Sequence, residues 1–339
     1  MSLGHRDEAK GEPMLDLHAP WMPVARPNTG NPLWRGLVTV LSSSVPYSLD
    51  PTPGLLAPAD EALHTATRIS VPIGDHTSPG WIFTPKRGTG GTVLLAHGTT
   101  AEKTLPYYFW IRELLHAGIR VMTFELDGHG DNPRPLCCPG LDDNVPAALR
   151  FLREQPDVDP ARIGLIGVSL GGACVLNAAP NEAGIKAVVT VSAPYRLSLD
   201  EWNRLSEALG TLSPEVLPVL MEATPNKLLA FLQTQIRVAP SLDHLPEEAD
   251  MLDPRTADAV NRALRYLNPL DNATRLGETP LLVINGEWDN ISPPWQAAEI
   301  YERATGPKSL ALVPRRNHFT VMVSRQAVEA AVHWFRRWL

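Results

Sequence analysis

The fold is decided by residues 162–176, RIGLIGVSLGGACVL. The apolar and β-branched run RIGLIG predicts a buried strand, and the small residues from Leu170 onward predict a helix. Between them, Gly167-Val168-Ser169-Leu170-Gly171 fits GxSxG, the pattern of a sharp strand-to-helix turn that lifts its serine above a sheet. Glycines surround the serine because so tight a turn leaves almost no room for side chains. This stretch therefore predicts a strand, a turn carrying Ser169, and a helix.

Other strand-like runs alternate with helical patterns along the chain. Strands are predicted at 67–73, 80–85, 92–96, 119–124, 162–167, 185–192, 280–285 and 309–313. Helices are predicted around 104–117, 143–155, 170–179, 254–267, 294–304 and 323–338. Most strands are continuously apolar, as in parallel sheets covered on both faces, whereas the first two predict an antiparallel hairpin joined by GDHTSP (74–79). The alternation predicts an α/β fold with a mostly parallel, doubly wound sheet.

Two segments interrupt this alternation. Residues 1–65 are rich in Pro, Gly and Ser and predict an irregular N-terminal arm, which either closes over a pocket or mediates formation of a homodimer. Residues 196–268 contain several helix starts, including the capping-box pattern SLDE from Ser198, but no clear strand. We therefore expect a core made of residues 66–195 and 269–339, with a helical lid inserted at 196–268.

Composition excludes several classes of protein. The 339 residues are 44% hydrophobic and 20% charged, as in soluble globular proteins, and the formal net charge of -7 argues against a nucleic-acid partner. The sequence has neither a signal-peptide pattern nor a long apolar run, so we expect a cytoplasmic protein without a membrane partner. Cys137, Cys138 and Cys174 match no zinc or disulfide pattern and are interpreted as reduced packing residues, with a redox role for the adjacent pair as the alternative.

A serine hydroxyl needs a neighbouring base before it becomes a good nucleophile. His318 has the best position among the ten histidines, because it lies in RRNHF, between the last predicted strand and the final helix. The base in turn needs an acid that fixes its tautomer. Asp289, in GEWDNISPP after the strand at 280–285, is the preferred candidate, and Glu287 is the alternative. Surface or packing roles are expected for His5, His18, His64, His76, His244 and His333, and His116 belongs to a predicted helix.

The order Ser169, Asp289, His318 is that of one fold, and the sequence resembles the α/β-hydrolase superfamily, in particular its esterases, thioesterases and serine aminopeptidases. The resemblance covers about residues 67–339 and rests on five motifs: HGTT at 97–100, DGHGD at 127–131, DPARIGLIGVSLGG at 159–172, GEWDNISPP at 286–294 and NHF at 317–319. It implies an α/β-hydrolase fold, a helical lid after the strand that ends near Ser192, and Thr99 as the second backbone donor to an oxyanion. The first donor is Leu170, at the start of the predicted helix.

The resemblance implies a serine hydrolase that cleaves an acyl ester of a small or medium, largely apolar substrate through an acyl-enzyme, without a cofactor. Thioester cleavage, acyl transfer and carbon–carbon bond hydrolysis use the same triad and remain alternatives, as does a non-catalytic ligand-binding protein on this fold. The lid residues Trp202, Leu228, Phe231 and Leu232 either roof an apolar pocket or pack lid helices on one another. Structural roles, and no metal site, are expected for the polar residues of the two motif loops: His97, Asp127, His129 and Asp131.

Overall fold

The computed structural model describes residues 63–88, 90–99, 103, 108–130, 132–197, 236–237, 248–249, 254–322 and 324–339. Residues 1–62 of the predicted arm and the lid residues Trp202, Leu228, Phe231 and Leu232 lie outside the described residues. Their expected roles therefore stay predictions.

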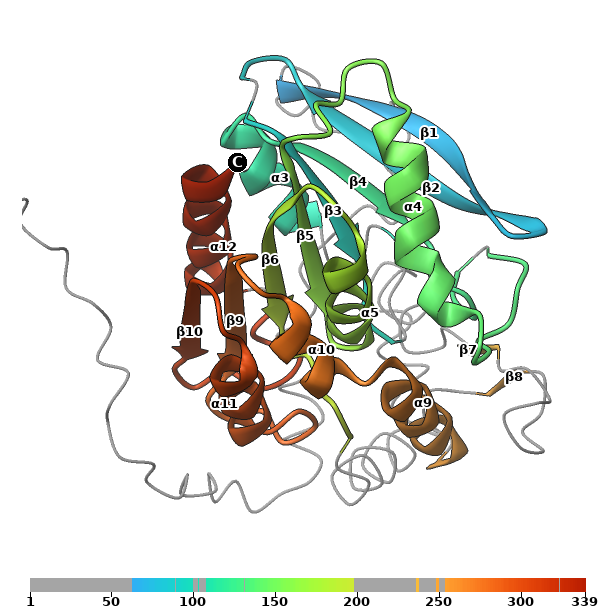
Figure 1. Cartoon of the computed structure of the whole chain (residues 1–339), viewed down its shortest axis with the longest axis vertical. Coiled ribbons are helices and arrows are strands. Elements are labelled where there is room, and N and C mark those ends of the chain that lie inside the picture. The colour runs from blue at the N-terminus through green and yellow to red at the C-terminus, as the bar shows by residue number, and fades with distance from the viewer. Residues whose placement is uncertain are drawn as a thin grey trace, which may run out of the picture.

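The described chain alternates strands and helices (Figure 1). The strands are β1 (His64–Ile73), β2 (His76–Pro85), β3 (Thr92–Ala96), β4 (Arg120–Phe124), β5 (Ile163–Val168), β6 (Ile185–Val191), β7 (Ile236–Arg237), β8 (Glu248–Ala249), β9 (Leu281–Gly286) and β10 (Lys308–Val313). The α-helices are α3 (Tyr108–His116), α4 (Asn144–Arg153), α5 (Leu170–Ala178), α9 (Pro254–Leu267), α10 (Pro269–Arg275), α11 (Pro294–Arg303) and α12 (Arg325–Trp338), with 3-10 turns η1 (Leu141–Asp143) and η2 (Ala179–Asn181). Each strand and helix predicted above is present, with its ends displaced by at most a few residues.

One eight-stranded sheet organises the molecule, in the order β1-β2-β4-β3-β5-β6-β9-β10. The pairs β1–β2 and β2–β4 are antiparallel, and all pairs from β4 to β10 are parallel. The predicted α/β-hydrolase architecture is thereby confirmed. The parallel strands bring their carboxyl ends to one edge of the sheet, and loops at that edge carry Thr99, Ser169, Asp289 and His318.

Helices cover both faces of the sheet, so there are two apolar cores. One core combines α4, α5, α9, α10 and α11 with one face of the sheet, and the other combines α3 and α12 with the opposite face. All six residues of β5 are buried, which explains why this strand is continuously apolar. Among the described residues, no helix combines the length and apolarity needed to cross a membrane.

The predicted antiparallel hairpin is confirmed, but its loop is shorter than the predicted residues 74–79. β1 and β2 pair up to Ile73 and His76, so the turn consists of Gly74 and Asp75 alone, with Gly74 at φ 60°. A two-residue hairpin turn requires positive φ, which glycine adopts without steric cost. His76 consequently lies at the start of a strand, where its Nε2 is 3.1 Å from Oδ1 of Asp127.

Residues 196–268 also differ from an insertion made of helices alone. β7 and β8 form a short antiparallel pair within this range. α9 matches the predicted helix at 254–267, and it buries Ala259, Ala263 and Leu264 in the same core as α5. The amide of Asn261 holds the segment after β6, because its Oδ1 accepts the N–H of Leu197 at 2.6 Å. The end of the predicted lid is therefore packed on the sheet domain.

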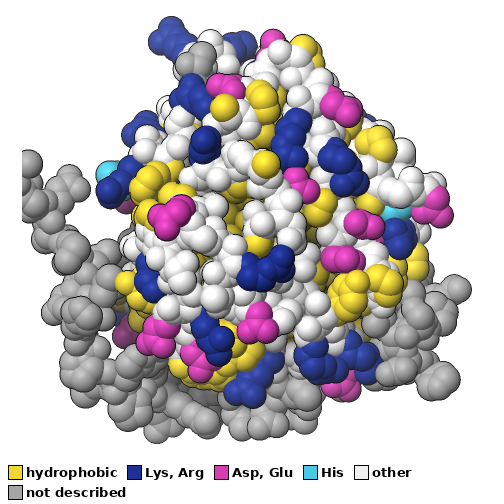
Figure 2. Space-filling view, viewed as in Figure 1, with side chains coloured by type: hydrophobic (Ala, Val, Ile, Leu, Met, Phe, Trp, Pro, Cys, Tyr) yellow, Lys and Arg dark blue, Asp and Glu magenta, His cyan; other side chains and the backbone are white. Residues whose placement is uncertain are grey.

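On the face shown in Figure 2, basic and acidic side chains of the described residues are interspersed with apolar ones. Cys137, Cys138 and Cys174 are free thiols, as predicted. Burial raises the pKa of Cys138 to about 12 and raises that of Cys174 further, which keeps both thiols protonated at neutral pH. A thiol in this state is a poor nucleophile, so these two residues behave as packing side chains.

Candidate active site

Ser169 occupies the turn between β5 and α5, with φ 51° and ψ -119°. Its N–H donates to the carbonyl oxygen of Val191 at 2.9 Å, which fixes the turn to the end of β6. A Cβ atom at Gly171 would lie 2.3 Å from the carbonyl oxygens of both Ala96 and His97, and one at Gly167 would lie 2.2 Å from the carbonyl oxygen of Gly171. The glycines predicted from the sequence are therefore sterically required, because the end of β3 presses against the start of α5.

His318 lies in the loop between β10 and α12, and its imidazole reaches the turn after β5. Its Nε2 is 3.1 Å from the Oγ of Ser169, although 149 residues separate the two in the chain. Both side chains are buried, with 5% of each residue exposed. This distance is within hydrogen-bonding range, so the Ser169 hydroxyl can transfer its proton to the imidazole of His318 without further movement.

Asp289, in the loop after β9, contacts the other nitrogen of the imidazole. Nδ1 of His318 is 2.9 Å from Oδ2 and 3.2 Å from Oδ1 of this carboxylate. Oδ1 also accepts the N–H groups of Ile291 at 3.0 Å and Ser292 at 2.8 Å. Glu287, the alternative acid, instead accepts the N–H of Arg315 at 3.1 Å. The carboxylate that contacts the imidazole is therefore that of Asp289, whereas Glu287 contacts the main chain of the loop after β10.

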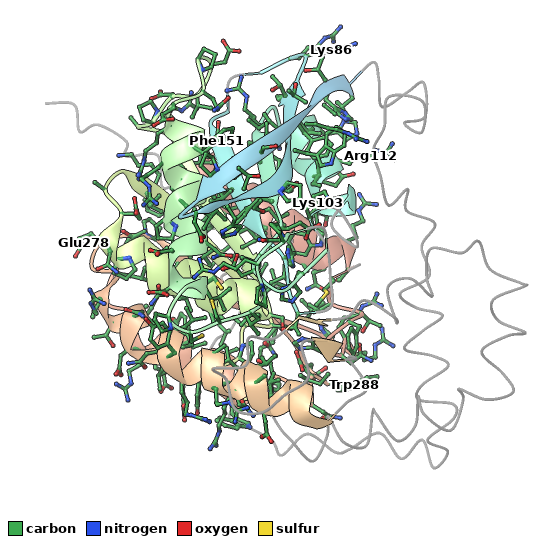
Figure 3. All side chains as sticks on the ribbon, turned by 90° about the vertical axis from the view of Figure 1, so that its right-hand side faces the viewer. Lys86, Lys103, Arg112, Phe151, Glu278 and Trp288 are labelled. Carbon is green, nitrogen blue, oxygen red and sulfur yellow. The ribbon has the colours of Figure 1, made fainter. Side chains whose placement is uncertain are left out.

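The loops of Asp289 and His318 are joined by main-chain contacts that extend the pairing of β9 with β10. The N–H of Glu287 donates to Val313 at 3.0 Å, and the N–H of Trp288 donates to Arg316 at 2.8 Å. Trp288 is labelled in Figure 3, in the lower part of the molecule where α9 also lies. Because main-chain hydrogen bonds join these two loops, they help to fix the distance between the Asp289 carboxylate and the His318 imidazole.

The two predicted oxyanion donors lie on segments that meet at the turn. Leu170 is the first residue of α5, and the first N–H groups of a helix have no acceptor within it. Thr99 follows β3, whose last residue Ala96 pairs with Gly167 of β5. The Oγ1 of Thr99 is buried and has no hydrogen-bond partner among the described residues.

The residues of the DGHGD motif (127–131) form a polar network beside this site. Asp127 is buried, and its carboxylate accepts from Asn132 at 3.1 Å and Asn144 at 3.0 Å. Burial raises the pKa of Asp127, although its hydrogen bonds and the nearby Arg134 act in the opposite direction. His129 packs edge-on against His97 at 5.0 Å between ring centroids. The hydrogen bond from Asn144 ties the loop to the start of α4.

Comparison with known families matches residues 93–331 to the alpha/beta hydrolase family. This range exceeds half of the chain and contains the Ser169, Asp289 and His318 loops. The chain belongs to this family. Membership of this family accounts for the fold and for the order of the three loops along the chain.

Relatives of this α/β hydrolase include named enzymes. A thiohydrolase of Aspergillus aculeatus is 24% identical over 257 residues, which cover 69% of this chain and 80% of that protein. A polyketide transferase of Penicillium crustosum is 26% identical over 232 residues, which cover 61% of this chain and 74% of that protein. The esterase domain of a Rhodothermus marinus protein shares the fold, with a TM-score of 0.54, 21% identity and coverage of 81% of this chain and 99% of that domain. Family and relatives together identify a hydrolase.

Within the described part of this α/β hydrolase, no three His, Cys, Asp or Glu side chains gather in a way that could hold a metal ion. His97 instead orients its own loop: its Nδ1 is 2.8 Å from the carbonyl oxygen of Gly98, and its Nε2 accepts the N–H of Leu126 at 2.9 Å.

Three residues that sequence reasoning missed support the site of the α/β hydrolase. Asn317 accepts the N–H groups of Phe319 and Thr320 through Oδ1, at 3.1 and 2.8 Å, and so shapes the turn that presents His318. Trp110 of α3 donates its indole N–H to the carbonyl oxygen of Met322, which anchors the end of the same loop. Glu125 is fully buried after β4. Only Glu125 had a signal in the sequence, namely a carboxylate placed directly after an apolar strand.

Proposed function

We propose that this α/β hydrolase is a serine hydrolase that cleaves an acyl ester of a small or medium, largely apolar substrate. The observation that supports the proposal most strongly is the continuous contact from the Oγ of Ser169 to Nε2 of His318 at 3.1 Å and from Nδ1 to Asp289 at 2.9 Å.

In the first half of the proposed reaction, the Oγ of Ser169 attacks the ester carbonyl carbon while Nε2 of His318 accepts the hydroxyl proton. Asp289 stabilises the imidazolium and holds its Nδ1–H. The carbonyl π electrons become a negative charge on oxygen, which accepts the N–H groups of Leu170 and Thr99. The tetrahedral intermediate collapses when the alcohol leaves with the proton from His318, and the acyl group stays on Ser169.

In the second half, water attacks the acyl-enzyme carbonyl and gives one proton to His318. The new tetrahedral intermediate expels the Oγ of Ser169, which regains that proton, and the carboxylic acid departs. The imidazole thus acts as base and then as acid in each half, while Asp289 keeps its charge throughout.

A thioester substrate, with hydrolysis or acyl transfer, is the second candidate. It is favoured by the names of two relatives, a thiohydrolase and a polyketide transferase. The same residues serve this reaction, because a thiolate leaves in place of an alkoxide and an alcohol or amine can replace water. The two candidates differ only in the leaving group and in the nucleophile of the second half.

The test compares turnover of p-nitrophenyl butyrate with that of a butyryl thioester, with and without an added alcohol. We expect ester hydrolysis that is abolished in Ser169→Ala, because the covalent step is lost. A thioester turnover at least tenfold faster, measured as kcat/KM, supports the second candidate. Equal esterase activity in wild type and Ser169→Ala contradicts both.

A further inference from the structure

We infer that Asn285, near the end of β9, is a positioning residue that holds the acid of the triad against the imidazole. The inference rests on the proposed function, because it concerns the orientation of Asp289 in that reaction. Asn285 touches none of the reacting atoms. It acts through the main chain of the acid loop, which we define as residues 287–293, between β9 and α11.

The side-chain amide of Asn285 closes the acid loop onto the strand that precedes it. Its Nδ2 donates to the carbonyl oxygen of Ser292 at 3.0 Å and to that of Gly286 at 3.1 Å. Nδ2 carries two hydrogens, so both bonds can form together. The carbonyl oxygen of Gly286 also accepts the N–H of Asp289 at 3.2 Å. The two ends of the loop therefore converge on one amide group.

Ser292 connects this amide to the acid. Its carbonyl oxygen accepts from Asn285, while its N–H donates to Oδ1 of Asp289 at 2.8 Å. Oδ2 of the same carboxylate lies 2.9 Å from Nδ1 of His318. A chain of hydrogen bonds thus leads from the amide to the imidazole, and every residue in it is buried.

The two halves of the acid loop are held by different parts of the sheet. The N–H groups of Glu287 and Trp288 bond the first half to β10 and the loop after it. Among the hydrogen bonds of the described residues, the one that joins residues 290–293 to the sheet comes from Asn285. Ile291 also packs into the apolar core, but apolar contact is not directional. Loss of the amide therefore frees the main chain that orients the Asp289 carboxylate.

An amide is an unexpected side chain at this position of β9. Asn285 is fully buried, and the other residues of the strand are apolar or glycine. Alternation along the strand places it on the same face as Leu281 and Val283, which lie in the core that includes α11. Its Oδ1 has no hydrogen-bond partner among the described residues, which costs stability. The bonds of its NH2 group to the acid loop explain why an amide stands here in place of an apolar side chain.

The test measures hydrolysis of p-nitrophenyl butyrate by the full chain, with kcat and KM determined separately. Asn285→Leu and Asn285→Ala both remove the donor, and only the first keeps most of the side-chain volume. The matched control is Asn272→Leu, since Asn272 of α10 is also buried and its Nδ2 donates to the carbonyl oxygen of Leu267 at 2.8 Å, at the end of α9. Urea unfolding of each variant measures the loss of stability.

We expect both Asn285 variants to lower kcat about 10- to 100-fold, because displacing a catalytic group by about 1 Å can cost about 100-fold. KM should change less than threefold. Asn272→Leu should lose stability in urea yet keep kcat within threefold of wild type. In an Asp289→Asn background, Asn285→Leu should lower kcat less than threefold further, because the carboxylate that the amide positions is gone.

The inference is overturned by wild-type kcat in the Asn285 variants, by a change in KM alone, or by an equal loss of kcat in Asn272→Leu. A loss of kcat in the Asp289→Asn background as large as in the wild-type background overturns it too. If one Asn285 variant does not fold, the other decides the matter. Failure of both to fold assigns the amide to the stability of β9 and contradicts the inference.

Labelling with a fluorophosphonate separates this inference from the proposed function. If Ser169 of the wild-type protein is not labelled, the proposed function is refuted, and the inference with it. If Ser169 is labelled, the rates of the Asn285 variants bear on the inference alone.

Discussion

Replacing Asp289 with asparagine changes one atom of the proposed triad and tests its geometry closely. Oδ1 of Asp289 accepts the N–H groups of Ile291 and Ser292, at 3.0 and 2.8 Å, and neither amide can do anything but donate. The asparagine oxygen must therefore take this position, and its NH2 group must face Nδ1 of His318. A donor there requires Nδ1 to accept, which moves the imidazole proton to Nε2.

A proton on Nε2 points at the Oγ of Ser169, so the imidazole can no longer accept the hydroxyl proton. In a Ser-His-Asp triad this tautomer lowers kcat about 10⁴-fold, equivalent to about 5 kcal/mol in the barrier. The loss is large because it reverses the direction of the hydrogen bond that activates the nucleophile, while the side-chain shape is unchanged.

The assay is steady-state hydrolysis of p-nitrophenyl butyrate at pH 8, with thermal unfolding recorded to show that the variant is folded. Glu287→Gln is the matched control, since Glu287 contacts the amide of Arg315 and not the imidazole. It should retain kcat within threefold. The reasoning is refuted if folded Asp289→Asn keeps more than a tenth of wild-type kcat, or if Glu287→Gln loses as much.

Three further predictions concern stability. Gly171→Ala forces a Cβ to within 2.3 Å of two backbone oxygens, so urea unfolding should show a loss of about 2 to 3 kcal/mol; an unchanged midpoint contradicts the packing described. Trp110→Phe removes the indole N–H that donates to the carbonyl oxygen of Met322, so the free energy of unfolding, measured in the same way, should fall by about 1 to 3 kcal/mol. An unchanged free energy of unfolding contradicts a stabilising role for this hydrogen bond. Burial raises the pKa of Glu125, but its polar neighbours, among them the Lys103 ammonium, outweigh burial and lower the pKa to about 2 from an ordinary value of 4.5. The ionisation of Glu125 therefore contributes stability above pH 4.5 that is lost as the pH falls towards 2. The free-energy difference between wild type and Glu125→Gln should therefore shrink by about 3 kcal/mol over that range, and a difference independent of pH refutes the charge assignment.

The sequence was sufficient for the central sheet and for the loops of the candidate site. The strand, turn and helix at RIGLIGVSLGG (162–172) could be predicted because the β-branched run, the glycines around Ser169 and the small helical residues are all local features of the sequence. His318 and Asp289 followed from their places after consecutive strands, since parallel strands bring their carboxyl ends together.

The supporting contacts could not be predicted because they join residues far apart in the chain. The indole of Trp110 meets Met322 across 212 positions, and Lys103 meets Glu125 across 22. No periodic pattern encodes such pairs. The hairpin was predicted correctly, but its loop was predicted too long for a local reason. All six residues of GDHTSP are of types common in loops, whereas the turn needs only Gly74, at positive φ, and Asp75, and the strand begins again at His76.

The central claim is that the hydroxyl of Ser169 becomes a covalent nucleophile through His318. It is tested most directly by treating the folded protein with a fluorophosphonate, digesting it and mapping the modified peptide by mass spectrometry. The account predicts one adduct, on Ser169, that forms at least 10³-fold more slowly in His318→Ala. An adduct on another residue, or an undiminished rate in His318→Ala, contradicts the account.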